Sequence, residues 1–378
     1  MAFILQNHTK SSKGILIIKH LEVVFFNAMS REKTSKLREK YIIGLYFGIY
    51  TSRKNDYKNI DFYVGEDNVI EIAKTVIPNL NLNGYNFLPE SVFVEKKLKK
   101  QFDFIFIGDP SRRKRLSMLI NSINKALDQC SFSVLIINRT KSKSLYSKFL
   151  NKIVRASLGK MNYNKRSHIT YLEVDQSNNT LIPRDVMPFF IESSKCLIIP
   201  SLVEGAARVV AESLSKGLNV ISFIDMKGAT NNHLHKGYDL LFQNEKDLVQ
   251  KIIFYVKNFD IRFANKNINY KDIFFENKSK EKLKIFLEEN FKDIKIDKEN
   301  LISIKLTNSF QSHNTFLPRY LPSNKKTDEC LTFDSMYRTI CYLTENPIKK
   351  HSIYLYKISM PIYEIKLFLK QIITKIIN

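Results

Sequence analysis

Short apolar runs alternate with amphipathic segments through the middle of the chain. The clearest example is the segment 196–223, CLIIPSLVEGAARVVAESLSKGLNVISF. Its first five residues are a continuous apolar run, 207–216 repeats apolar residues at helical spacing, and 219–223 is a second apolar run. Gly217 lies where a helix stop is expected. A strand, a loop, a helix and a second strand in this order are one step of a parallel α/β sheet.

The same alternation continues on both sides of this segment. The pattern predicts strands at 102–107, 133–137 and 169–174, and helices at 116–127, 245–257 and 278–290. Upstream it predicts one or two strands in 14–28, a short strand at 60–64, and a helix at 69–76 that is capped by 65–68. A chain of 378 residues is long enough for two or three domains with sizeable cores.

The loop before the helix at 207–216 carries the candidate chemistry. Glu204 is followed by the small residues Gly205, Ala206 and Ala207, and Glu212 lies eight residues after Glu204. Small residues at a helix N-terminus leave backbone N–H groups open to an anion such as a diphosphate. A carboxylate one to two turns into the helix can accept hydrogen bonds from two neighbouring hydroxyls, as on a ribose. Two surface glutamates at the start of a helix are the alternative.

These residues resemble a motif of the retaining glycosyltransferases of family 4, which have the GT-B fold. The matching residues, in the family's order and register, are Pro200-Ser201, Glu204-Gly205, Glu212 and Gly217-Leu218-Asn219-Val220-Ile221. The resemblance implies that Glu204 contacts the donor sugar and that Glu212 holds the nucleotide ribose. Ala207 replaces the second loop glycine of the family and Asn219 its usual proline; Ala adds only a methyl group, so phosphate can still approach.

A second motif of the family follows the strand at 102–107. The family has a glycine there, then an arginine, then a lysine at the helix start, and both cations hold the donor diphosphate. Gly108 and Lys114 match, whereas Asp109 occupies the arginine position, so Arg112 or Arg113 would have to substitute. Consecutive cations at a helix start oppose the helix dipole and favour a phosphate among them. A solvated basic loop is the alternative.

The resemblance implies an α/β, GT-B-like fold in which two Rossmann-like domains face a cleft. It is strong over 102–290 and weak over 60–93, so the N-terminal domain is shortened. We expect an acceptor-side domain at 1–95, a nucleotide-sugar-binding domain at 96–293 and a helical extension at 294–378. The end of the extension, 353–378, is mostly apolar with spaced lysines. This segment suits either a helix that lies at an anionic membrane surface or a helix that completes the first domain. We favour packing on the first domain.

The net charge of +23 requires a partner or a generally solvated basic surface. Nucleic acid is disfavoured because the lysines are spread along the chain and no helix-turn-helix, zinc-finger or RNA-recognition pattern occurs. An anionic membrane surface is the better candidate. The four cysteines lack metal-type spacing, and no charged segment precedes the first apolar run as in a secretory signal. We therefore expect a cytoplasmic protein that is peripheral at the inner face of the membrane.

The resemblance implies a hexosyl- or glycosyltransferase that moves a sugar, with retention, from a nucleotide-diphosphate donor to a glycan or lipid-linked acceptor. A role in cell-surface polysaccharide biosynthesis, including lipopolysaccharide, would follow. No Asp-x-Asp motif occurs, so we expect a metal-independent reaction with the nucleotide sugar as substrate and no cofactor. Two alternatives stay open: a non-catalytic relative that acts as a binding or scaffold subunit, and a sugar-nucleotide epimerase.

Overall fold

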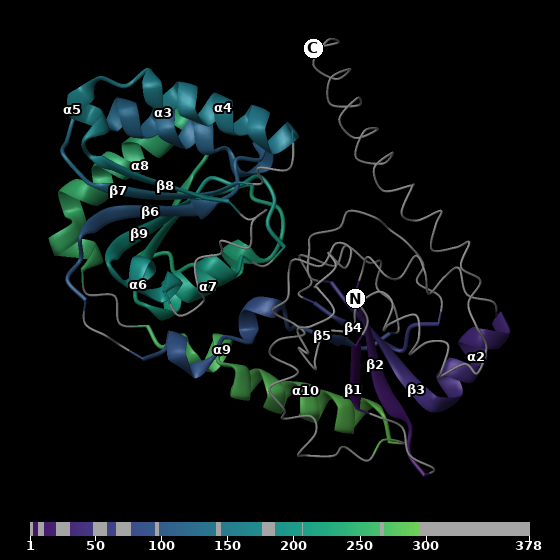
Figure 1. Ribbon diagram of the computed structural model, residues 1–378. Helices are drawn as coiled ribbons and strands as arrows, with labels where there is room; N and C mark the ends of the chain where they lie inside the picture. The colour runs from purple at the N-terminus through teal and green to yellow at the C-terminus, as the bar shows by residue number, and fades with distance from the viewer. Residues whose placement is uncertain are drawn as a thin grey trace.

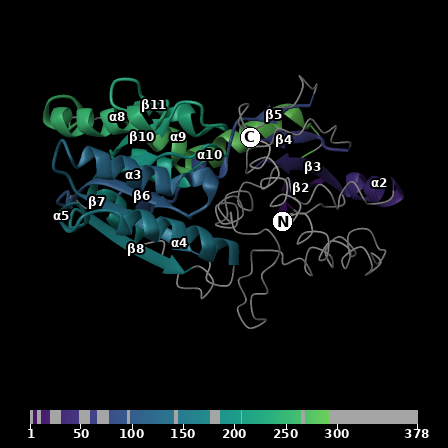
Figure 2. The ribbon, with the colours of Figure 1, turned by 90° about the horizontal axis from the view of Figure 1, so that it is seen from above.

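The computed structural model describes residues 3–6, 11–19, 31–47, 59–65, 77–94, 98–140, 145–175, 186–205, 207–264, 268–292 and 294. Several expected features lie outside the described residues: the helix at 69–76 with most of its cap, Ala206, and the extension from 295 onward with its segment 353–378. The described residues form two sheets, each covered by helices (Figures 1 and 2).

The larger sheet has six parallel strands in the order β11-β10-β9-β6-β7-β8. Its strands are β6 (Phe102–Gly108), β7 (Val134–Thr140), β8 (Ile169–Asp175), β9 (Ser194–Ile199), β10 (Asn219–Phe223) and β11 (Leu240–Phe242). The chain starts in the middle of the sheet, builds one half outward and then returns to build the other. This is the strand order of a doubly wound, Rossmann-type domain.

Helices cover both faces of this sheet, with α3, α4, α5 and α8 on one side and α6 and α7 on the other (Figure 1). Their bounds are α3 (Leu116–Ala126), α4 (Leu145–Gly159), α5 (Tyr163–Arg166), α6 (Met187–Glu192), α7 (Arg208–Ser215) and α8 (Glu245–Asn258). Shorter helical turns are η3 (Arg112–Lys114), η5 (Thr230–His233), the π-helical η6 (Phe259–Phe263) and α9 (Lys271–Phe274).

The apolar runs of the sequence become buried strands because both faces of the sheet are covered. Phe104, Ile105, Ile136 and Ile198 are each at most 1% exposed. The expected strands and helices of this domain are confirmed within a few residues at their ends, and the bounds of β10 match. The sequence pattern missed α4, which lies in a Lys- and Ser-rich stretch.

The smaller sheet has five strands in the order β1-β2-β3-β4-β5. They are β1 (Phe3–Gln6), β2 (Gly14–Lys19), β3 (Tyr41–Tyr46), β4 (Phe62–Val64) and β5 (Asn79–Leu80), and α2 (Arg31–Lys40) precedes β3. The pairs from β2 to β5 are parallel, whereas β1 is antiparallel to β2. This is a small α/β domain, as the shortened N-terminal part of the sequence indicates.

Helix α10 (Glu276–Asn290) leaves the second domain and packs on the first sheet. Leu283 and Leu287 of this helix are fully buried with Ile15, Ile17 and Phe62 of the sheet. The ring of Phe62 lies 5.7 Å from that of Phe286 and 5.5 Å from that of Phe291. The expected boundary at residue 293 therefore does not follow the packing, because the small sheet needs an apolar partner and α10 supplies one.

The two sheets are joined by a short polar and aromatic junction. It includes η1 (Gly84–Asn86) and η2 (Glu90–Val92) from the first part of the chain. Leu88 exchanges backbone hydrogen bonds with Phe274 and Glu276, at 2.8 and 3.0 Å. Tyr85 Oη lies 2.8 Å from His233 Nε2, and both rings stack edge-on against Phe274. These contacts place the end of the first domain beside η5 and α9 of the second.

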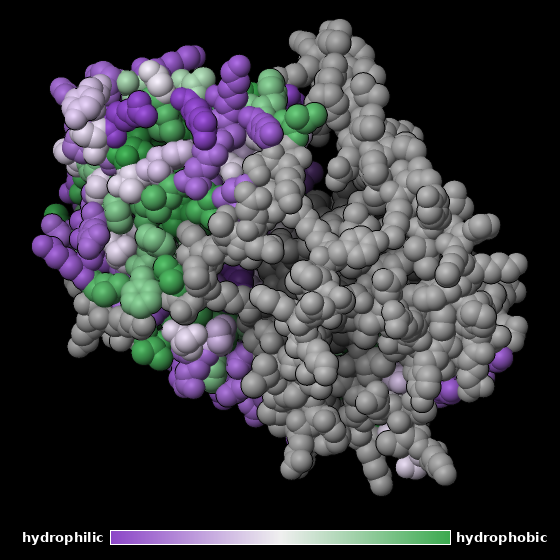
Figure 3. Space-filling view, viewed as in Figure 1, coloured by the Kyte–Doolittle hydropathy of each residue, from purple (hydrophilic) through white to green (hydrophobic). Residues whose placement is uncertain are grey.

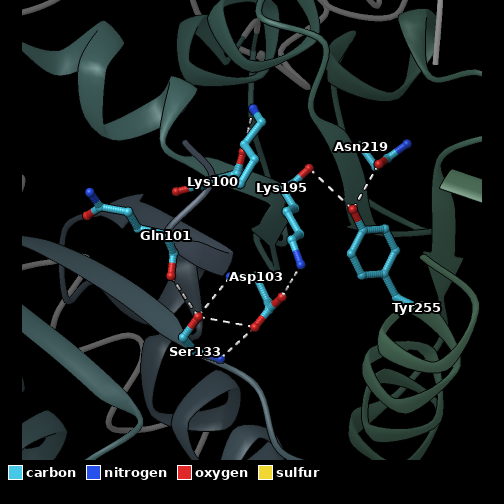
Figure 4. A network of polar contacts seen from close by, with 8 residues as sticks. Lys100, Gln101, Asp103, Ser133, Lys195, Asn219 and Tyr255 are labelled. Carbon is cyan, nitrogen blue, oxygen red and sulfur yellow. Dashed lines mark hydrogen bonds and ion pairs between the residues drawn. The ribbon is translucent and has the colours of Figure 1, made fainter. Parts of the chain in front are cut away.

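Charged side chains lock the amino ends of the strands in the larger sheet (Figure 4). Asp103 accepts hydrogen bonds from Lys195 Nζ at 2.8 Å and from the Ser133 backbone N–H at 2.8 Å. Burial raises the pKa of Asp103, but these donors and the Lys195 charge outweigh it and lower the pKa. Lys216 Nζ lies 3.0 Å from Glu192 Oε2, with side chains 3% and 9% exposed. The charged groups named here at the amino ends of the strands thus have their partners within the protein.

Candidate functional site

The strand order fixes where a ligand site is expected. β6 and β9 are neighbours, but β6 continues to α3 on one face of the sheet and β9 continues to α7 on the other. In doubly wound sheets, ligands bind outside the carboxyl ends of the strands at this switch point. The loops that leave these two strands, 109–115 and 200–207, are the two that carry the sequence motifs.

The two loops meet through a buried ion pair. Lys114 Nζ donates directly to Glu204 Oε1, and the two side chains are 9% and 11% exposed. The cation comes from the loop after β6 and the carboxylate from the loop after β9. Low exposure weakens solvent screening of the attraction between the two charges. Two residues that the sequence predicts for one site, 90 positions apart, are thus brought into contact.

Two further contacts fasten these loops to each other. The Leu202 backbone N–H donates to Arg113 O at 2.8 Å, and Arg115 Nε donates to Pro200 O. The Arg115 guanidinium also lies 3.9 Å from the centre of the Phe223 ring, and its burial lowers its pKa. Arg115 has a left-handed backbone, with φ of 50°, between η3 and α3. This arginine therefore positions the loop, and the run of cations at 112–115 does not act as one cluster.

The backbone of Glu204 is held by the loop that follows β10. The Glu204 N–H donates to Lys227 O at 2.9 Å, and the Ala229 N–H donates to Gly205 O at 2.9 Å. Gly228 lies between these contacts with φ of 108°, and a Cβ there would be 1.6 Å from Glu204 O. Only glycine allows this approach. Gly228 is thus a positioning residue that the sequence motifs did not single out.

Glu212 lies one turn inside α7 and has an arginine partner. Arg208 Nε donates to Glu212 Oε1 at 2.7 Å, and the side chains are 17% and 13% exposed. The Ala207 N–H donates to Thr230 Oγ1 at 3.2 Å. This amide, which the sequence analysis leaves open for an anion, is therefore engaged by a side chain of the protein.

The remaining predicted residues lie around Lys114. Gly108 ends β6, and a Cβ there would be 2.7 Å from the Phe106 ring. Arg112 and Arg113 are exposed, and Arg113 Nη2 lies 3.8 Å from Asp109 Oδ2. Burial raises the pKa of Asp109, but hydrogen bonds from Ser111 and the charges of Arg113 and Lys114 outweigh it and lower the pKa. Asp109 is an anion beside these cations.

The hydroxyl of Ser201, on the loop that follows β9, is buried and has no hydrogen-bond partner within the described part of the chain. The whole residue is 0% exposed. Buried polar atoms are nearly always paired, because desolvation without a partner costs about 1–3 kcal/mol. Ser201 therefore adds a hydroxyl group to the loop that carries Glu204.

The structure thus brings together Lys114 and Glu204, and it places Glu212, Ala207 and Gly205 on the adjoining loop and helix. Arg208, Arg115 and Gly228 were missed by sequence reasoning. The four-residue spacing of Arg208 and Glu212 is a readable signal for an ion pair. In the described ranges, no group of three or more His, Cys, Asp and Glu residues is arranged to hold a metal ion. None of the helices described is long and apolar enough to cross a bilayer.

No family model matches the chain, and no curated protein matches its sequence significantly. Its structure is similar to a trehalose-6-phosphate synthase studied with bisubstrate glycomimetics, with a TM-score of 0.50, 11% identity, and coverage of 73% of this chain and 70% of that one. The E. coli protein bound with UDP-2-fluoro glucose gives the same four values. An alpha,alpha-trehalose-phosphate synthase (UDP-forming) from Burkholderia vietnamiensis has a TM-score of 0.46 at 15% identity, with 68% of each chain covered.

These similarities bear on the fold alone. The mixed α/β architecture, with one parallel and one mostly parallel sheet, and its GT-B neighbours confirm the expected fold class. Membership of family 4 stays a prediction.

Proposed function

We propose that the chain is a glycosyltransferase that moves a sugar from a nucleotide-diphosphate donor to a glycan or lipid-linked acceptor, with retention at the anomeric carbon. The observation that carries this proposal is the buried Lys114–Glu204 pair at the switch point of a Rossmann-type sheet. Membership of family 4 and a role in cell-surface polysaccharide biosynthesis belong to the same proposal.

The chemistry needs stabilisation of negative charge on the leaving group. The bond between the anomeric carbon and the diphosphate oxygen breaks, the acceptor oxygen bonds to that carbon, and the acceptor proton passes to the departing phosphate. Lys114 would stabilise the growing charge on the diphosphate. Arg112 and Arg113, which are exposed on the same turn, would add positive charge at the entrance.

Donor binding would exchange the partners of the ion pair. Lys114 and Glu204 are ion-pair partners in the structure. A diphosphate offers Lys114 a more strongly charged acceptor, and the sugar hydroxyls offer Glu204 hydrogen-bond donors. Glu212 would likewise leave Arg208 to accept the ribose hydroxyls. The buried hydroxyl of Ser201 adds support, because a donor would supply a partner to it.

A thermal-shift screen of the full chain with UDP, GDP, CDP and ADP and their sugars tests the proposal. UDP and UDP-glucose are the first to try, because a structural neighbour was solved with UDP-2-fluoro glucose. We expect one nucleoside diphosphate to raise the melting temperature of the parent and to have less effect on Lys114→Met. Release of that diphosphate from its sugar should continue in EDTA. No shift with any nucleotide would overturn the proposal, and binding without turnover would favour a non-catalytic relative.

A further inference from the structure

Helix α4 (Leu145–Gly159) has an outer surface that no transfer chemistry explains. Four large apolar side chains are exposed on it: Leu145 at 83%, Phe149 at 55%, and Tyr146 and Ile153 at 40% each. No other helix in the described ranges carries more than one exposed large apolar residue. Single exposed apolar residues are normal on a protein surface, but a contiguous group on one element marks an interaction site.

The spacing of these residues makes them a continuous row. Leu145, Phe149 and Ile153 are four residues apart, so they lie above one another on one side of the helix. The row extends for about 12 Å along the helix axis. The opposite side of α4 is buried through Leu150, Val154 and Leu158. The helix therefore has one apolar face in the domain core and a second apolar row at the surface.

A cationic row runs beside the apolar one. Lys148 and Lys152 are exposed on the neighbouring side of α4, and Arg155 follows there, paired with Glu173 at 2.8 Å. Within the described residues, neither lysine has a carboxylate partner. No Asp or Glu occurs anywhere between Asp128 and Glu173. Figure 3 shows hydrophobic and hydrophilic residues side by side at the upper edge of this domain, over α4.

We propose that the outer surface of α4 docks the protein on an anionic lipid bilayer. Apolar and cationic rows that run in parallel fit a surface where acyl chains lie beneath anionic headgroups. In this arrangement the side chains of Leu145, Phe149 and Ile153 insert between lipids, while Lys148 and Lys152 contact phosphate groups. Nucleic acid suits the surface less well, because the aliphatic side chains of Leu145 and Ile153 offer no ring for base stacking.

The position of α4 adds a geometric consequence. α4 follows the carboxyl end of β7, and the Lys114–Glu204 pair lies beyond the carboxyl end of β6, which is paired with β7. The N-terminal end of α4, where Leu145 lies, therefore belongs to the same edge of the sheet as the candidate site. Docking through this end turns that edge toward the lipid.

A single tryptophan reports directly on insertion, because the natural chain has none. Phe149→Trp in the full chain is mixed with vesicles of phosphatidylcholine alone or with added phosphatidylglycerol. We expect a blue shift of emission and quenching by brominated lipid with the anionic vesicles only. Leu145→Trp gives a second reporter on the row. Ile261→Trp is the matched control, because Ile261 is 86% exposed on another helical turn, and its emission should not change.

Sedimentation with the same vesicles measures the contribution of each row. Lys148→Gln and Lys152→Gln should each lower the partition coefficient about fivefold, while Lys246→Gln and Lys282→Gln on α8 and α10 serve as charge-matched controls. Leu145→Ser with Phe149→Ser should reduce binding with an unchanged melting temperature. The proposal is overturned if the row variants bind like the parent, if Phe149→Trp is not quenched, or if only an RNA homopolymer shifts its emission.

Discussion

The two edges of the larger sheet each hold a buried lysine–glutamate pair, but the pairs have different surroundings. At the amino edge, Lys216 contacts Glu192 and also donates to Val94 O at 2.5 Å, while Lys100 donates to the carbonyls of Glu192 and Ser194. These contacts tie the segment that joins the domains to α6, α7 and β9. The charges there serve the fold.

At the carboxyl edge, the Lys114–Glu204 pair joins two loops that separate to opposite faces of the sheet. The hydroxyl of Ser201, on the loop that carries Glu204, is buried without a partner within the described chain. A buried ion pair is therefore not a sign of function by itself. Its place in the strand order and the polar atoms around it decide which pair is a candidate site, and the following variants test that distinction.

The largest effect is expected from Lys216→Met at the amino edge. Removal of the cation leaves the Glu192 carboxylate buried without its counter-charge, which should lower the free energy of unfolding by about 3–5 kcal/mol. Urea denaturation measures this change. The double variant Lys216→Met with Glu192→Leu should recover much of the loss. A single variant as stable as the parent would show that this pair does not hold the domain.

Lys114→Met tests the pair at the carboxyl edge. Loss of the cation should lower kcat for the donor about 10²–10³-fold, because one preorganised group that stabilises developing charge is removed. Release of nucleoside diphosphate under saturating donor measures it. Lys125→Met is the control, because that side chain is 63% exposed and pairs with Glu245 elsewhere. A kcat equal to that of the parent would contradict the assignment.

Glu212→Gln tests whether Glu212 contributes to nucleotide binding rather than to turnover. The loss of a carboxylate that accepts ribose hydroxyls should weaken binding of the nucleoside diphosphate by about 1–3 kcal/mol. Isothermal titration measures this, with Glu281→Gln, which is 62% exposed on α10, as the control. Glu204→Gln should bind the nucleotide more nearly like the parent and lose turnover. Equal affinity of Glu212→Gln and parent would remove Glu212 from the site.

The smallest effect concerns the two aspartates at the ends of β6. The pKa of Asp103 and that of Asp109 are both lowered in the folded chain. Each therefore stabilises the fold above its unfolded pKa of about 4, and this stability is lost as pH falls through the folded pKa. In Asp103→Asn and in Asp109→Asn, the free energy of unfolding should therefore fall less steeply than in the parent as the pH is lowered. Urea denaturation at a series of pH values measures this. If a variant loses as much stability as the parent below about pH 4, the prediction is wrong.

The second domain was predictable because its elements depend on local pattern. The runs at β6, β9 and β10 are continuous and apolar, and the spacing of Glu204 and Glu212 is readable in the sequence. The contact of Lys114 with Glu204 was not readable from spacing, because it follows from β6 and β9 being neighbours. Helix α4 was missed because its lysines and serines obscure the four-residue repeat of Leu150, Val154 and Leu158.

The crossing of α10 to the first sheet has a consequence for synthesis of the chain. The last strand of that sheet ends at Leu80, but the helix that covers its apolar face begins at Glu276. At usual ribosomal rates, translation of the intervening chain takes about 10–40 s. During that interval all the described strands of the second domain, from β6 to β11, are synthesised, whereas the helix that covers the first sheet is not yet made. The nascent chain therefore completes its domains in the reverse of their order along the sequence.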